Sequence, residues 1–129
     1  MQSYLWVTLG SAFGGMARAW CSGLLARRFG EAFPWGTLAV NIVGSFVIGL
    51  ADAVAAAGSP ARQLVIAGLC GGFTTFSAFS LQTLFLFRGG QGLSAAANVG
   101  ASVVACLAAV WIGHLAGAVL HGVALVLPR

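Results

Sequence analysis

Long apolar stretches separated by short polar segments constrain the fold of this chain more than any other feature. A bilayer core of about 30 Å is crossed by about 20 helical residues, and four stretches of roughly that length stand between charged, glycine or proline residues. They cover about 4–25, 35–57, 61–87 and 93–120. We therefore predict an all-α membrane protein, in which residues 1–129 form a single integral membrane domain with four transmembrane helices.

The composition agrees with a membrane protein and argues against several functions. Hydrophobic residues make up 60% of the chain and charged residues 6%, proportions outside the range of soluble domains. The formal charge of +4 comes from arginines, which we interpret as anchors at the membrane surface rather than as a nucleic-acid site. The segments between the spans leave no room for a catalytic domain, and no metalloprotease motif or phosphate loop is present. We expect no nucleic-acid partner and no enzymatic activity.

Residues 68–82, GLCGGFTTFSAFSLQ, lie inside the third apolar stretch but do not resemble an ordinary membrane anchor. They include three glycines, four hydroxyl residues and three phenylalanines. Glycine and hydroxyl side chains allow a membrane helix to unwind where its freed backbone groups bind an ion or line a wet cavity. The sequence therefore predicts that the third helix is broken near its middle, and that the break is a site.

A few polar or aromatic residues elsewhere in the spans have two interpretations each. The amide of Asn41 could donate to an anion or form a hydrogen bond between helices. Arg18 could attract anions or hold backbone carbonyls, or its side chain could extend to the interface. Phe76 and Phe79 share one helical face, where they could pack in the core or turn their positive ring edges toward an anion. These alternatives stay open at the level of single residues.

The arginines are almost evenly divided between the two sides of a four-helix membrane protein. Arg27, Arg28 and Arg88 would lie on one side, and Arg62, Arg129 and the terminal amine on the other. This balance gives the positive-inside rule little to act on. A chain without a preferred orientation could insert both ways, which permits an antiparallel dual-topology homodimer, in which two copies supply what inverted repeats supply in larger transporters.

Three pairs of glycines have the GxxxG spacing that lets membrane helices approach closely. They are Gly10 with Gly14, Gly68 with Gly72, and Gly113 with Gly117. The spacing alone does not distinguish contacts between subunits from packing inside one chain.

Three segments in the right order together resemble the CrcB/Fluc family of fluoride channels. They are GSAFGGMARAW (10–20), WGTLAVNIVGSFVIG (35–49) and GLCGGFTTFSAFS (68–80). The resemblance implies a passive fluoride-selective channel, a multi-pass protein of the cell inner (plasma) membrane that lets a cell lose toxic fluoride. It also implies a dual-topology homodimer surrounded by membrane lipid, with two pores and a structural sodium ion at its centre.

The resemblance assigns roles to individual residues. Backbone carbonyls at the helix break hold the sodium ion in such channels, and these positions match Gly71 and Thr74. Phe76 and Phe79 match the phenylalanines of the pores, and Asn41 matches the pore amide. The other matched positions are the hydroxyls near the ion path, Ser77, Ser80 and Ser102, and the first-helix arginine, Arg18.

The sequence departs from the family pattern at positions that are often hydroxyl, acidic or tyrosine residues. These positions are Ala78, Gln82, Asn98, Cys106 and Val110. They put in doubt the row of polar side chains that the family pattern implies along the fourth helix. The matched sodium and phenylalanine positions are unchanged.

Two other functions are consistent with a small four-helix membrane protein. A dual-topology, proton-coupled multidrug exporter needs a carboxylate at the centre of the membrane, and the available residue is Asp52, late in the second span. An interfacial cap near the helix end is the competing interpretation of Asp52. His114 and His121 could bind a metal or shuttle protons, or they could be packed or interfacial residues. The last alternative, an assembly subunit without transport activity, gives no reason for the TTFSAF segment.

Overall fold

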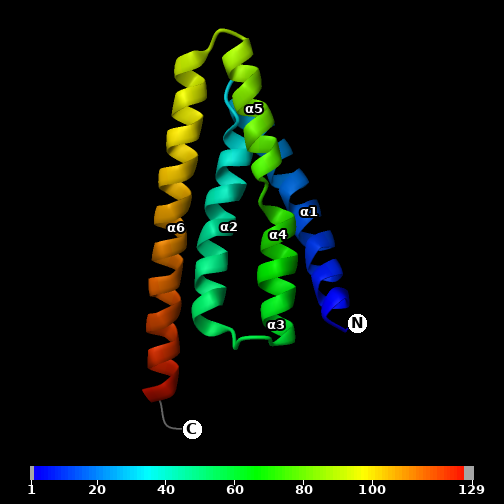
Figure 1. The fold of residues 1–129 in the computed structure, drawn as a ribbon, viewed down its shortest axis with the longest axis vertical. Helices are drawn as coiled ribbons and strands as arrows, with labels where there is room; N and C mark the ends of the chain where they lie inside the picture. The colour runs from blue at the N-terminus through cyan, green and yellow to red at the C-terminus, as the bar shows by residue number, and fades with distance from the viewer. Residues whose placement is uncertain (1, 127–129) are drawn as a thin grey trace.

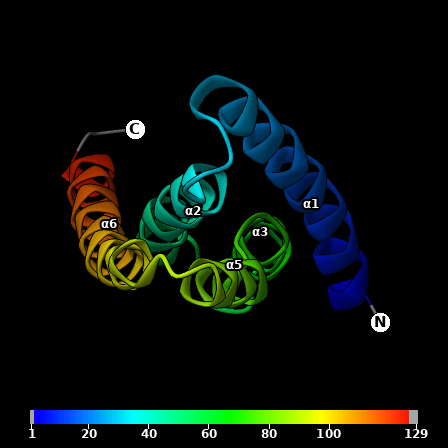
Figure 2. The same ribbon diagram turned by 90° about the horizontal axis from the view of Figure 1, so that it is seen from above.

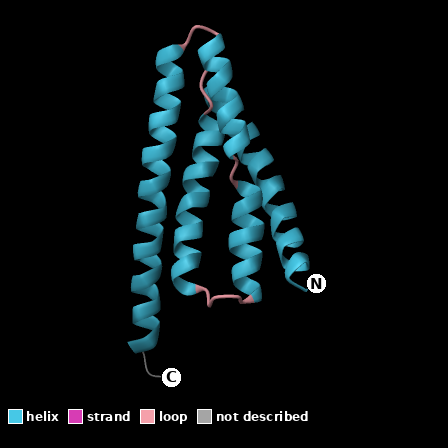
Figure 3. Cartoon of the chain, in the orientation of Figure 1, coloured by secondary structure: helices cyan, strands magenta, loops and turns pink. Residues whose placement is uncertain are grey.

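The computed structural model describes residues 2–126, and its long segments are all helical (Figure 1, Figure 3). No β-strand occurs in that range, so the predicted all-α fold is confirmed for the described residues. The elements are α1 (Gln2–Phe29), α2 (Trp35–Val54), α3 (Pro60–Arg62), the π-helix η1 (Gln63–Cys70), α4 (Gly71–Phe73), α5 (Phe76–Arg88) and α6 (Gly92–Val126). Together, α3, η1, α4 and α5 form the third long helix, which is interrupted between α4 and α5.

Local sequence explains where α2 ends and the third long helix begins. We predicted that the second helix would extend to about residue 57, but α2 ends at Val54 because Ala55 is extended, with φ −90° and ψ 125°. The chain then turns through Gly58, whose φ of +73° favours glycine. Ser59 caps the next helix by accepting a hydrogen bond from the Arg62 backbone N–H.

In contrast to α2, the last helix is longer than the sequence suggested. The apolar pattern placed its end near residue 120, whereas α6 continues to Val126. Its 35 residues exceed the number needed to cross a bilayer, so the helix must tilt or project from the membrane.

Three of the described helices are long and apolar enough to cross a membrane. They are Trp35–Val54, Pro60–Arg88 and Gly92–Gly122. α1 has 28 residues, which is sufficient length, but its composition is less apolar because it contains Arg18 and ends with Arg27 and Arg28. Three of the four predicted spans are therefore supported by both length and composition, and α1 by length alone.

The helices form a narrow bundle with α2 and the third long helix at its centre. Figure 1 shows α6 alongside α2, and Figure 2 shows α1 and α6 on opposite sides of the central pair. The contacts agree, because α2 packs most extensively on α6, and α1 packs on η1 and α4. The interruption of the third helix faces α2, because Asn41 of α2 forms hydrogen bonds with the Thr75 backbone.

Glycines make these close helix contacts inside a single chain. A Cβ atom at Gly10 or Gly14 would overlap the backbone of η1 or α4, and one at Gly72 would overlap the backbone of Ser11 in α1. On the other side of the bundle, Gly113 of α6 lies against the Phe46 carbonyl of α2. Of the two interpretations of the GxxxG pairs, the structure thus shows packing within the chain.

We predict that Gly14→Ala destabilises the protein, whereas Gly15→Ala does not. A Cβ at Gly14 would overlap the Leu69 carbonyl and crowd the Phe73 amide, while nothing lies within 4 Å of a Cβ at Gly15. Overpacking of this kind costs about 1–3 kcal/mol. Thermal unfolding in detergent should show a lower midpoint for Gly14→Ala only. Equal midpoints for the two variants would contradict the close contact between α1 and the third helix.

Candidate functional site

Thr74 and Thr75 form the break in the third long helix. Both residues are extended, with φ −88° and ψ 157° at Thr74 and φ −153° and ψ 112° at Thr75. The Thr74 N–H and Oγ1 each donate to the Cys70 carbonyl at 2.9 Å, which completes the helix before the break. Thr75 Oγ1 accepts a hydrogen bond from the Ala78 N–H at 3.2 Å and so caps α5. The break is thus a defined stop followed by a capped restart.

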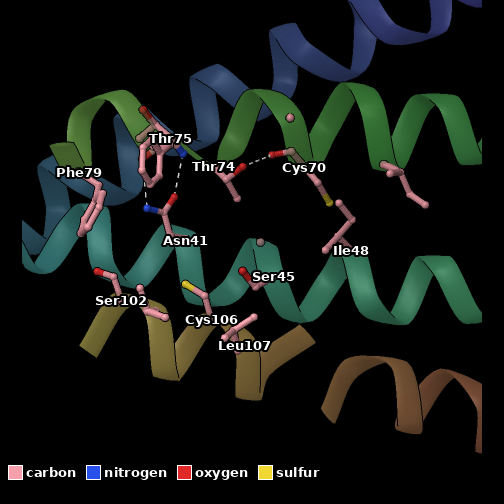
Figure 4. Close-up of a pocket in the computed structure, with 15 residues that line it drawn as sticks. Asn41, Ser45, Ile48, Cys70, Thr74, Thr75, Phe79, Ser102, Cys106 and Leu107 are labelled. Atoms are coloured by element: carbon pink, nitrogen blue, oxygen red, sulfur yellow. Dashed lines mark hydrogen bonds between the residues drawn. The ribbon is translucent and has the colours of Figure 1, made fainter. Parts of the chain in front are cut away.

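Asn41 of α2 binds the backbone of the break at both of its amide atoms. Its Oδ1 accepts from the Thr75 N–H at 2.7 Å, and its Nδ2 donates to the Thr75 carbonyl at 3.1 Å (Figure 4). The structure therefore shows the hydrogen bond between helices that the sequence left as one of two alternatives. The second N–H of Nδ2 makes no hydrogen bond within residues 2–126, so Asn41 still has one donor to offer.

Gly44 gives the break the space it needs. It is buried one helical turn after Asn41, and a Cβ there would overlap the Thr74 methyl group. Asn41 and Gly44 lie on one face of α2. One face of α2 therefore both binds and accommodates the two extended threonines.

The break leaves helix ends of opposite polarity close together in the chain. The preceding helix ends with the carbonyls of residues 71–73, and α5 begins with the backbone N–H groups of Phe76 and Ser77. A helix carries partial negative charge at its C-terminal end and partial positive charge at its N-terminal end. The first end suits a cation and the second an anion.

Oxygen donors at the break fit a hard cation such as sodium. The residues matched to the sodium site are Gly71, the first residue of α4, and Thr74, which follows its last residue. Hard cations prefer oxygen ligands, which backbone carbonyls supply. Residues 2–126 contain no group of three histidine, cysteine or acidic residues placed to hold a metal. A cation at this position would therefore depend on carbonyl and hydroxyl oxygens.

A cavity of about 450 Å³ lies beside the break, between α2, the third helix and α6 (Figure 4). It brings together six of the predicted site residues. These are Asn41, Gly71, Thr74, Phe76, Phe79 and Ser102. Ser45, Cys70 and Cys106 also line it, and sequence reasoning did not assign a role to Cys70.

The other predicted site residues lie outside this lining. Ser80 Oγ donates to the Phe76 carbonyl at 2.9 Å, and Ser77 Oγ lies 3.2 Å from Thr75 Oγ1, so both hydroxyls are engaged in the first turn of α5. Arg18 is partly exposed on α1 and makes no hydrogen bond or ion pair with the described residues. The structure does not bring Arg18 to the cavity of the same chain.

The two phenylalanines project from the start of α5. Their ring centroids are 5.3 Å apart and their planes are inclined by 45°. Phe76 is 79% exposed, so within one chain it is not packed in a core. Phe79 is partly buried and reaches into the cavity (Figure 4).

Polar groups on α6 divide into two roles. Ser102 Oγ is buried, lines the cavity and finds no hydrogen-bond partner within the described part of the chain. Asn98 is 1% exposed and lies between helices: its Nδ2 donates to Thr83 Oγ1 at 2.9 Å, which donates to the Phe79 carbonyl at 2.7 Å. Asn98 thus braces the backbone of Phe79 rather than lining the cavity. The sequence positions of Asn98 and Ser102 alone could not show that one lies between helices and the other lines the cavity.

Asp52 lies at the end of α2 rather than at the centre of a span. Its carboxylate pairs with Arg62 at Oδ1, and His114 Nδ1 lies 3.6 Å from Oδ2. Its side chain is 48% exposed. This position lacks the central burial that the exporter hypothesis requires, and matches the interpretation of Asp52 as a residue near the helix end.

These features define a small helical membrane protein whose third long helix is broken at a site built from backbone groups and side chains of α2 and α6. Residues 5–114 match the family described as CrcB-like protein, Camphor Resistance (CrcB). The chain belongs to this family, and the resemblance recognised in the sequence is confirmed.

Curated relatives match almost the whole chain. The Fluoride-specific ion channel FluC of Methylocella silvestris is 49% identical over 124 residues, which cover 92% of this chain and 95% of that protein. The proteins of the same name in Opitutus terrae and Rhodospirillum rubrum are 50% and 52% identical. They cover 94% and 92% of this chain, and 96% and 95% of their own lengths.

We predict that Asn41→Leu destabilises the protein because it removes both hydrogen bonds to Thr75. A buried donor or acceptor left without a partner costs about 1–3 kcal/mol. The measurement is chemical unfolding in detergent, together with amide hydrogen exchange at Thr75, which should accelerate. Ser45→Ala is the matched control, since Ser45 lines the same cavity from α2 without a hydrogen bond to the described residues. If both variants unfold alike, Asn41 does not hold the break.

Proposed function

We propose that this protein is a passive, fluoride-selective channel of the cell inner membrane, which exports toxic fluoride down its gradient. The observation that carries the proposal is the helix break bound by Asn41, in a chain whose relatives over more than nine-tenths of its length are named fluoride-specific ion channels. No nucleotide or covalent chemistry is part of the proposed mechanism.

All four long helices cross the membrane in this proposal. α1 has 28 residues and contacts η1 and α4 through Gly10 and Gly14, so it runs beside a helix that has both the length and the composition of a span. A helix packed backbone to backbone against a span shares its depth in the bilayer.

The functional unit in this proposal is an antiparallel homodimer. Arg27, Arg28 and Arg88 end their helices at one side, and Arg62 begins the third helix at the other, which leaves orientation weakly specified. Arg129 and the terminal amine, which also entered the charge comparison, lie outside the described residues. The 79% exposure of Phe76 beside the cavity supports a second copy that completes the site.

A structural sodium ion at the dimer centre is part of the proposal. The carbonyls of Gly71 and Thr74 from each copy would hold it, since they lie at the end of a helix whose partial charge is negative. When bound, the ion supplies a fixed positive charge that makes the interior more favourable for an anion. The residues of this chain then orient the carbonyls, chiefly through the contacts of Asn41 and Gly44 with the break.

Fluoride would move past donors that replace its hydration shell. The remaining N–H of Asn41, the unpartnered hydroxyl of Ser102 and the ring edges of Phe76 and Phe79 surround or border one cavity. Ser77 and Ser80 add hydroxyls at the start of α5. Arg18 would serve a vestibule or hold structure at a distance from the cavity.

Fluoride flux through liposomes tests the proposal directly. Purified protein should release fluoride from loaded liposomes, measured with a fluoride electrode, and chloride release should remain at the level of empty liposomes. Phe79→Ile should reduce fluoride release because it removes a ring edge from the cavity. Phe87→Ile is the matched control, since Phe87 is 69% exposed on the same helix and lines none of the described cavities.

Two results would count against this function. Fluoride release equal to that of empty liposomes, or equal release of chloride, would exclude a fluoride-selective channel. Undiminished release by Phe79→Ile would remove the ring from the conduction path.

Dual topology can be tested with a peptide tag inserted in the exposed turn at Gly58. In intact spheroplasts, about half of the tags should bind an antibody, and all should bind after the membrane is opened, because nearly balanced arginines allow both orientations. The ratio of the two signals is the measurement. Full labelling or no labelling before opening would contradict the antiparallel dimer.

A further inference from the structure

Asp52, Arg62 and His114 form a cluster at the end of the bundle where α2 turns into α3. Arg62 Nη2 donates to Asp52 Oδ1, and Arg62 Nη1 donates to the carbonyls of Asp52 and Ala55 at 3.4 and 3.3 Å. His114 of α6 approaches the other carboxylate oxygen at 3.6 Å. One guanidinium therefore both neutralises Asp52 and caps the C-terminal end of α2.

The cluster borders a cavity that shares part of its lining with the cavity beside the helix break. A second cavity of about 430 Å³ is lined by Asp52 and His114 together with apolar residues. Ile48 and Ile66 line this cavity and also the cavity beside the break. The two cavities therefore share these isoleucines in their linings, so that an ion leaving the break toward the α2–α3 turn would pass near the Asp52 carboxylate.

The charge of this carboxylate matters for an anion. An unpaired carboxylate repels fluoride, and the repulsion grows where low-dielectric helix walls replace water. Two titratable groups line the second cavity, Asp52 from α2 and His114 from α6, and Arg62 from α3 forms an ion pair with Asp52. With Arg62 in place, the ion pair of Arg62 and Asp52 has no net charge.

We propose that this cluster is one mouth of the fluoride path, and that Arg62 is a positioning residue that keeps Asp52 neutralised so that anions can enter. The inference rests on the proposed channel function. It assigns a role to Asp52, which lies outside the site at the break. It also explains why an acidic residue is tolerated beside a route for anions.

A double-mutant cycle of charge-neutralising substitutions tests the proposal with three variants: Arg62→Gln, Asp52→Asn and the double variant. Fluoride release is measured from liposomes at an ionic strength of about 0.01 M, where charges act over about 30 Å, and of about 1 M, where they act over about 3 Å. Arg62→Gln should slow release at least about threefold at low ionic strength and much less at high ionic strength. The double variant should return to the parent rate, and Asp52→Asn should equal or exceed it.

Controls separate this electrostatic role from a role in folding. Arg28→Gln removes an arginine from the exposed end of α1 and should leave the rate unchanged. All variants are compared by thermal unfolding in detergent. Because the ion pair is partly exposed, its loss should have little effect on stability.

Three outcomes would overturn the inference. If Arg62→Gln releases fluoride at the parent rate at low ionic strength, Asp52 does not impede anions. If the double variant stays as slow as Arg62→Gln, Arg62 acts only as a cap on α2. If the parent protein itself releases no fluoride, the proposed function fails, and the inference fails with it; the first two outcomes, with a conducting parent, overturn the inference alone.

Discussion

The pair of hydrogen bonds between Asn41 and the Thr75 backbone is the interaction on which the site depends. A backbone N–H or carbonyl without a partner is costly in an apolar environment, so a membrane helix cannot simply stop and restart. The side-chain amide of Asn41 has the donor and acceptor arrangement of a peptide group, and it satisfies one of each at the break. The position of α2 therefore fixes the position of the two helix ends that face each other at residues 74 and 75.

The packing of α2 and α1 explains why those ends are held in place. Gly113 and Gly117 bring α6 against the backbone of α2, and Gly10 and Gly14 bring α1 against η1 and α4. Small residues at these positions let the helix backbones approach closely. η1 is a π-helix separated from the break by the three residues of α4, and π-helical geometry is often found at functional sites. The irregular segment is thus supported on both faces by regular helices.

Much of this arrangement could be predicted from the sequence, and the rest depends on contacts between helices. The spans follow from the length of apolar runs, and the break from the glycines and threonines of residues 68–82. The π-helix could not be predicted, since it differs from an α-helix in which backbone carbonyl accepts the hydrogen bond of each amide. Whether Asn98 lines the cavity or contacts Thr83 depends on how α6 is rotated about its axis. Whether Gly113 packs within the chain depends on how closely α6 approaches Phe46 of α2. α2 ends earlier than predicted, before a turn at Gly58, and the length of the apolar stretch does not indicate where that turn begins.

The chemistry of the site follows from what the chain places at the break and what it keeps away. The cavity lining contains an amide, hydroxyls, thiols, aromatic rings and backbone groups, but no side chain that carries a full charge at neutral pH. Conduction requires binding strong enough to replace water and weak enough to release the ion. Partial charges on helix ends and ring edges meet this requirement better than an arginine at the same position, which would hold a small anion tightly. The full charges of Asp52 and Arg62 instead lie at the end of the bundle, paired with each other, where they can influence how an ion arrives without holding it.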